Sequence, residues 1–156
     1  MDDTQQFQFA IFTLDQQRYA LPYIAVKRVV RAMEITYLPK ASLDILGIIN
    51  IQGQLIPVLN LRKRFGMPER ELELQHYFVI CQAKHHLIAF IVDSAEGLQS
   101  CERHDIFPTN EIMPGGIEYI DNLIKRKDGL ILILDPENFL TNHEQKALDS
   151  LIIENA

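Results

Sequence analysis

The sequence has few of the residues that staple small extracellular proteins together. Among 156 residues it contains two cysteines, Cys81 and Cys101, and no tryptophan. Two cysteines cannot build a disulfide framework, so we expect a cytoplasmic protein with reduced thiols. The longest apolar runs, such as residues 130–134, are far too short to span a bilayer, and the acidic start at residues 1–4 is unlike a secretory signal. We therefore expect neither a disulfide scaffold nor a membrane-spanning protein.

The sequence also lacks patterns that carry catalysis or bind cofactors. His85 and His86 are adjacent in an expected turn, where their side chains point in opposite directions and make poor joint metal ligands. Cys81 lies in an apolar segment and reads as a core residue. The Gly-Gly pair at 115–116 precedes a strand, whereas a phosphate loop precedes a helix. We expect no enzyme, no metal and no cofactor, although an active site assembled only in three dimensions would escape such a search.

Length and composition indicate a single globular domain over residues 1–156. Apolar residues make up 47% of the chain, enough to build a core. The net charge of −6 is uneven, because residues 1–66 carry eight Lys/Arg against five Asp/Glu, and residues 67–156 carry seven against sixteen. This asymmetry either orients the protein on a partner or is merely uneven solvated charge. The acidity argues against nucleic-acid binding, and the basic run at 62–64 lacks the aromatic partners of a nucleic-acid platform, so it reads as a solvated turn or a protein contact.

Short β-strands with turn signals between them run along most of the chain, which predicts an all-β barrel or sandwich. The expected strand pairs are 7–14 with 19–21, 48–51 with 55–59, 77–83 with 87–92, and 118–126 with 130–134. Residues 87–92 are apolar at odd and even positions alike, so both faces of that strand require cover. Two small packed barrels would supply it, and so would one larger sandwich. We expect residues 66–75 to be the exposed connection between the two halves.

The chain is expected to end in a helix over residues 141–153. Thr141 and Glu144 have the spacing of a capping box, in which each side chain accepts a hydrogen bond from the other residue's backbone. Leu140, Leu148 and the pair at 151–152 fall near one helical stripe, so the helix is expected to dock its apolar side on the body.

Residues 47–62, GIINIQGQLIPVLNLR, resemble the central hairpin of the CheW family, which reads G-hydrophobic-hydrophobic-N-L-R-G-x-hydrophobic-hydrophobic-P-hydrophobic-hydrophobic-D-L-R. Its glycine turn reverses the chain. Its proline lies at a strand position where a backbone N–H donor is not needed for pairing. Further segments match the family in the right order, and together they cover about residues 7–150. They are the opening hairpin at 9–22, the connector at 35–39, the strand at 91–93 and the ending at 132–135.

The resemblance implies a fold of two SH3-like five-stranded β-barrel lobes packed together, with short helices and a C-terminal helix. It also implies a non-catalytic adaptor. Family members bind the regulatory domain of a CheA-type histidine kinase and the cytoplasmic tip of methyl-accepting chemoreceptors, so they reach the membrane only through the receptors. A small-ligand-binding β-barrel without a kinase partner is the alternative, and it would require a cavity that small barrels usually fill with side chains.

The match to the family's interaction surfaces nominates eight partner-binding residues. Val26 has an alternative place in the core, and Asn60 has an alternative role as the cap of the following turn. The nominated residues are Tyr23, Val26, Arg28, Gln52, Asn60, Arg62, Val92 and Asp93.

Three of these residues depart from the family pattern. The family usually has arginine at Gln52, aspartate at Asn60 and glutamate at Arg28. Loss of a guanidinium removes bidentate recognition of a carboxylate, and a reversed charge can exclude a partner. The departures indicate either altered partner specificity or drift at exposed positions.

Overall fold

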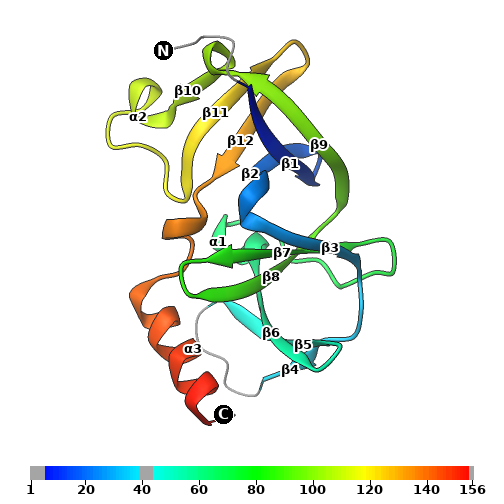
Figure 1. Ribbon diagram of the computed structural model, residues 1–156. Helices are drawn as coiled ribbons and strands as arrows, with labels where there is room; N and C mark the ends of the chain where they lie inside the picture. The colour runs from blue at the N-terminus through cyan, green and yellow to red at the C-terminus, as the bar shows by residue number, and fades with distance from the viewer. Residues whose placement is uncertain (1–5, 39–43, 155–156) are drawn as a thin grey trace.

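The computed structural model describes residues 6–38 and 44–154, with side chains up to residue 150. Two sheets form an upper and a lower lobe, and the C-terminal helix lies along the lower lobe (Figure 1).

The upper lobe is one six-stranded sheet in the order β10-β11-β12-β2-β1-β9. Its hairpins are antiparallel, and β12 pairs in parallel with β2. The strands are β1 (Gln6–Leu14), β2 (Gln17–Pro22), β9 (Ser94–Glu102), β10 (Ile106–Pro108), β11 (Ile120–Arg126) and β12 (Gly129–Leu134).

The lower lobe is a second six-stranded sheet in the order β3-β7-β8-β6-β5-β4. Here the parallel pair is β6 with β8. The strands are β3 (Val26–Arg31), β4 (Thr36–Tyr37), β5 (Ile45–Ile51), β6 (Gln54–Leu59), β7 (Tyr77–Ala83) and β8 (His86–Val92).

Short helices connect the strands, and one longer helix ends the described chain. They are η1 (Tyr23–Ala25), α1 (Leu61–Arg64), η2 (Arg103–Asp105), α2 (Thr109–Ile112), η3 (Pro136–Asn138) and α3 (Asn142–Glu154). The predicted capping box of α3 is present, since the Thr141 amide donates to Glu144 Oε1 at 3.0 Å and the Glu144 amide donates to Thr141 Oγ1 at 3.1 Å. Leu140 and Leu148 are buried as predicted, while the side chains at 151–152 lie outside the described residues.

The predicted all-β fold with short helices and a C-terminal helix is confirmed. Each sheet has six strands where five were expected, because β10 and β4 add a strand of three and two residues at one edge of each sheet. The expected division at residues 66–75 is wrong. That segment connects α1 to β7 within the lower lobe, and the chain changes lobes at η1 and again between β8 and β9.

The strand that was expected to need cover on both faces has it. In β8, Ile88, Phe90 and Val92 join a core cluster that also contains upper-lobe residues such as Phe12 and Leu134. Ala89, between them, packs into a separate cluster inside the lower lobe, and a third cluster fills the upper lobe. Because successive side chains of a strand point to opposite faces, one face of β8 packs into the core of the lower lobe and the other packs into the seam between the lobes.

Candidate functional site

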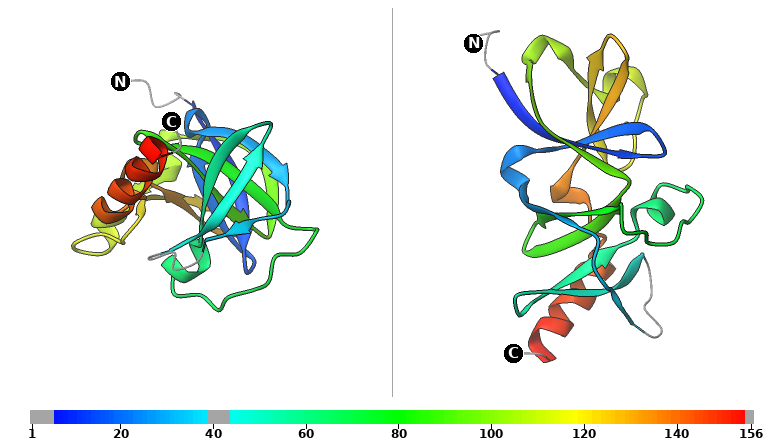
Figure 2. Two further views of the ribbon diagram at one scale, coloured as in Figure 1. Left: turned by 90° about the horizontal axis from the view of Figure 1, so that it is seen from below. Right: turned by 90° about the vertical axis from the view of Figure 1, so that its right-hand side faces the viewer.

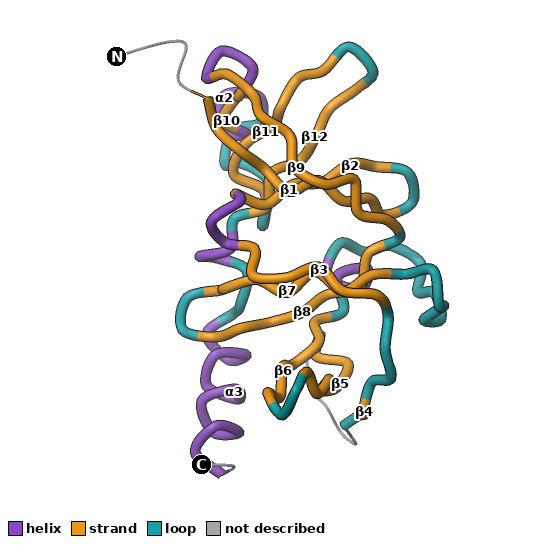
Figure 3. Tube along the Cα trace, turned by 45° about the vertical axis from the view of Figure 1, so that its right-hand side comes forward, coloured by secondary structure: helices purple, strands orange, loops and turns teal. Residues whose placement is uncertain are grey.

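A groove of about 350 Å³ lies at the seam between the two lobes. We call it the seam groove. Its upper wall comes from β1 and β9, and its lower wall from β3 with one residue of β7. Figure 3 shows β1 and β9 above β3 and β7. Both β9 and β3 are edge strands of their sheets, so the groove runs between two sheet edges.

Large apolar side chains are exposed along this groove. Leu98 of β9 is 54% exposed, and Tyr23 and Val29 are also exposed. Ile24, the neighbour of Tyr23 in η1, is 85% exposed. Exposed apolar residues that gather around a concave surface are typical of protein-interaction sites.

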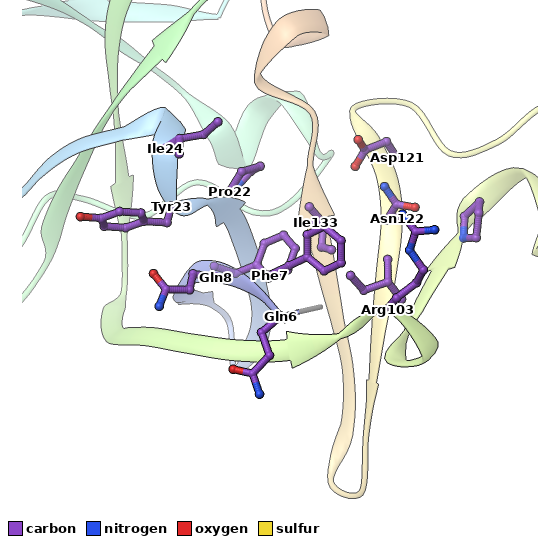
Figure 4. A pocket seen from close by; sticks show the side chains of 13 residues that line it. Gln6, Phe7, Gln8, Pro22, Tyr23, Ile24, Arg103, Asp121, Asn122 and Ile133 are labelled. Carbon is purple, nitrogen blue, oxygen red and sulfur yellow. The ribbon is translucent and has the colours of Figure 1, made fainter. Parts of the chain in front are cut away.

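A wider hollow of about 790 Å³ opens on the upper lobe and shares Tyr23 with the seam groove. Figure 4 shows Tyr23 and Ile24 on one side of it and Arg103 and Asn122 on the other. Because Tyr23 lines both hollows, they form neighbouring parts of one concave surface.

An ion-pair cluster fastens the lobes together away from this groove. Arg62 Nη2 lies 2.9 Å from Asp15 Oδ1 and 2.8 Å from Asp93 Oδ1. The Asp15 amide donates to Asp93 Oδ2 at 2.7 Å, and the Asp93 amide donates to the Thr13 carbonyl at 2.9 Å. The cluster thus joins the β1–β2 turn of the upper lobe to α1 and the end of β8 in the lower lobe. The right panel of Figure 2 shows this turn and α1 on the same side of the molecule. The hydrogen bond from Arg62 lowers the pKa of the Asp15 carboxyl.

The described residues offer little for catalysis or metal binding. No three of their His, Cys, Asp or Glu side chains come together as a metal site. Burial raises the pKa of the Cys81 thiol to about 12, so the reactive thiolate is scarce. Within the described part of the chain, no helix is long and apolar enough to cross a membrane.

Comparison with known proteins supplies the family. The sequence-family model of the CheW-like domain matches residues 8–144. The chain belongs to the CheW family. It is 27% identical to the chemotaxis protein CheW of Treponema pallidum over 94% of this chain and 89% of that one. With CheW of Bacillus subtilis the identity is 25% over 88% of each chain.

A solved structure agrees with this assignment. The crystal structure of the scaffolding protein TtCheW from Thermoanaerobacter tengcongensis matches with a TM-score of 0.75 and 27% identity, over 84% of this chain and 90% of that one. The predictions of a CheW-type fold and of a non-catalytic chemotaxis adaptor are therefore confirmed.

Three of the nominated residues of this CheW-family chain come together. Tyr23, Val26 and Arg28 all line the seam groove. Val26 is partly buried against the core cluster that lies between the lobes. The alternative prediction, that Val26 is a core residue, is therefore also partly confirmed. The ladder between β3 and β7 changes register between Val26 and Arg28, and the bulge lets consecutive residues of β3 face the groove.

The other nominated residues lie elsewhere. Gln52 is exposed in the β5–β6 turn, with a φ of 53°. Asn60 caps α1, because its side chain accepts from the Lys63 amide at 3.1 Å, as the alternative reading expected. Arg62 and Asp93 belong to the ion-pair cluster. Val92 is 0% exposed in the core, which leaves its side chain no surface to offer a partner.

Two buried polar side chains, Arg64 and His86, were not predicted. Arg64, from the basic run that read as a solvated turn or a protein contact, pairs with Glu144 of α3 and with Asp44 at 3.1 Å. His86, expected in a surface turn, is buried, and its Nε2 lies 2.8 Å from Asp149 Oδ1 of α3. Both pairs hold the C-terminal helix on the lower lobe. The one signal in the sequence is Glu144, which stands four residues before Leu148 and so falls on the apolar stripe of the helix that must dock.

Proposed function

We propose that this protein is a cytoplasmic adaptor that couples the cytoplasmic tip of methyl-accepting chemoreceptors to the regulatory domain of a CheA-type histidine kinase. The proposal is carried by the match of the CheW-like domain to residues 8–144. It is supported by two separate exposed surfaces, the seam groove and the β5–β6 turn, since an adaptor must hold two partners at once.

The receptor is assigned to the seam groove. An apolar groove with exposed Leu98 and Tyr23 suits a helix that lays its apolar face into it. In this assignment Tyr23, Val26 and Arg28 contact the receptor directly.

The kinase is assigned to the β5–β6 turn. Gln52 and Leu55 are exposed there and combine a polar and an apolar contact at a hairpin end. Asn60, Arg62, Val92 and Asp93 support binding indirectly in this proposal, because they shape α1, the lobe junction and the core.

Calorimetry with both partners tests the proposal. The full chain is titrated separately with the kinase regulatory domain and with a receptor-tip fragment, both from the source organism. We expect binding to each, and we expect either partner to bind when the other is already present. A folded sample that binds neither partner contradicts the proposal.

A further inference from the structure

The seam groove carries charge of a single sign. Its lining residues include two charged side chains, Lys27 and Arg28, and both are cationic and exposed on β3. The opposite wall on β9 contributes Ala95, Gly97 and Leu98, which carry no charge. We call Lys27 and Arg28 the basic rim. The chain has a net charge of −6, so this rim does not follow from the overall composition.

The charges of the rim are not neutralised within the described part of the chain. Neither Lys27 nor Arg28 has an ion-pair partner among the described residues. Glu96, the nearest acidic residue along β9, pairs with Arg18 at 3.0 Å on the upper lobe. The rim is therefore free to attract an anionic group on whatever occupies the groove.

Both edge strands of the groove disfavour an added β-strand. The β3 edge is bulged between Val26 and Arg28 and carries cations, two devices that block edge pairing. The β1–β9 ladder is also irregular, between Ile11 and Phe12, and Gly97 on β9 has a φ of 81°. An extended peptide would lose regular backbone pairing on either side, whereas a helix satisfies its own backbone and needs only the apolar walls.

We propose that the seam groove selects an amphipathic helix whose apolar face is flanked on one side by carboxylates. The apolar face packs against Val26, Val29 and Leu98, and the carboxylates meet Lys27 and Arg28. The inference rests on the proposed function, because it specifies the chemistry of the helix that the groove receives.

A pair of designed helical peptides tests this selection without any receptor sequence. Both carry the same apolar residues at helical spacing, and one has glutamates along one flank where the other has lysines. Binding to the full chain is followed by NMR shifts of the Tyr23, Val26 and Leu98 amides at low ionic strength. We expect the acidic peptide to bind roughly three- to tenfold more tightly than the basic one, the range for two exposed charge pairs.

Variants make the test specific to the rim. K27E/R28E should invert the preference, and the neutral variant K27Q/R28Q should abolish it, which keeps the test decisive if the reversal variant fails to fold. K125E/K127E makes the same charge change on the β11–β12 hairpin, outside the groove, and should preserve the wild-type preference. Equal binding of the two peptides, shifts that map elsewhere, or an unchanged preference in K27Q/R28Q overturns the inference. Failure of the proposed function would instead appear as absent binding to receptor and kinase fragments, whatever the peptides do.

Discussion

The guanidinium of Arg64 and the carboxylate of Glu144 form an ion pair in which both side chains are 1% exposed. The pair joins α1 to α3 across 80 positions of the sequence. Arg64 also donates to the Phe139 carbonyl, and its guanidinium carbon lies 5.1 Å from the centre of the Tyr119 ring. This one side chain therefore fixes the C-terminal helix, the segment before it and the lower lobe relative to each other.

Removing one partner of this pair should destabilise the protein strongly. Arg64→Met leaves the Glu144 carboxylate buried without its cation, and such losses cost about 3–5 kcal/mol of unfolding free energy. Urea denaturation measures the change. Arg70→Met is the control, because the Arg70 side chain is 43% exposed and its two pairs are long, at 3.8 Å to Glu73 and 3.7 Å to Asp93. Such exposed pairs should contribute less than about 1 kcal/mol. The account is wrong here if the two variants lose similar stability.

The Arg62 cluster should be visible in the titration of Asp15. The hydrogen bond from Arg62 lowers the pKa of Asp15 in the folded state. A carboxyl with a lowered folded pKa contributes its stability fully above its unfolded pKa of about 4, and the contribution is lost as the pH falls through the lowered value. In Arg62→Met the pKa of Asp15 should return toward its ordinary value, as followed by NMR of the carboxyl carbons. Asp128, whose pKa is lowered by Arg18, should not move in this variant. An unchanged Asp15 would show that the cluster does not persist in solution.

Gly47, the first residue of the family hairpin, should resist substitution for steric reasons. A Cβ at this position would lie 2.2 Å from the Thr36 carbonyl oxygen and 2.9 Å from Ile35 Cγ2. Gly47→Ala should therefore push β4 away from β5 and cost about 1–3 kcal/mol. Gly53→Ala meets no atom within 4 Å, so the cost of its φ of 89°, about 1 kcal/mol, acts alone. NMR shifts at Thr36 and Tyr37 should change in the first variant and not in the second. Unperturbed shifts in Gly47→Ala would contradict the close approach.

Leu98 should separate the two proposed partners. Leu98→Asp places a carboxylate on the apolar wall of the seam groove and should weaken receptor-tip binding by about tenfold, with kinase binding unchanged. Leu74→Asp makes the same change at a side chain that is 87% exposed in the connection between α1 and β7, and should leave both affinities intact. Calorimetry measures all four affinities. Equal losses for both partners would remove the assignment of the groove to the receptor.

The hairpins and the C-terminal helix could be predicted from the sequence because their signals are local. Thr141 and Glu144 are three residues apart in the sequence. The turn between β5 and β6 is indicated by Gln52 and Gly53, whose φ angles are both positive. The strand β9 was not predicted. Glu96, Gly97 and Leu98 are all exposed there, so the strand has no apolar alternation, and its pairing with β1 comes from tertiary structure.

The site could be predicted only in part, because the position of several of its side chains depends on contacts between residues that are distant in the sequence. Tyr23, Val26 and Arg28 are close in sequence and remain together in the groove. Arg62 and Arg64 look like a solvated run, yet their partners Asp93 and Glu144 are 31 and 80 positions away. No local pattern distinguishes an inward-facing arginine from an exposed one when the compensating carboxylate lies on another element.

Sedimentation of receptor-containing membranes with the kinase tests the central claim most directly. Membranes that carry a chemoreceptor of the source organism are mixed with its CheA-type kinase, and the kinase in the pellet is measured with and without this protein. The account predicts that this protein raises the amount of pelleted kinase, and that Leu98→Asp weakens this effect. Kinase recovery that is the same in the presence and absence of a folded, wild-type protein would contradict the adaptor function.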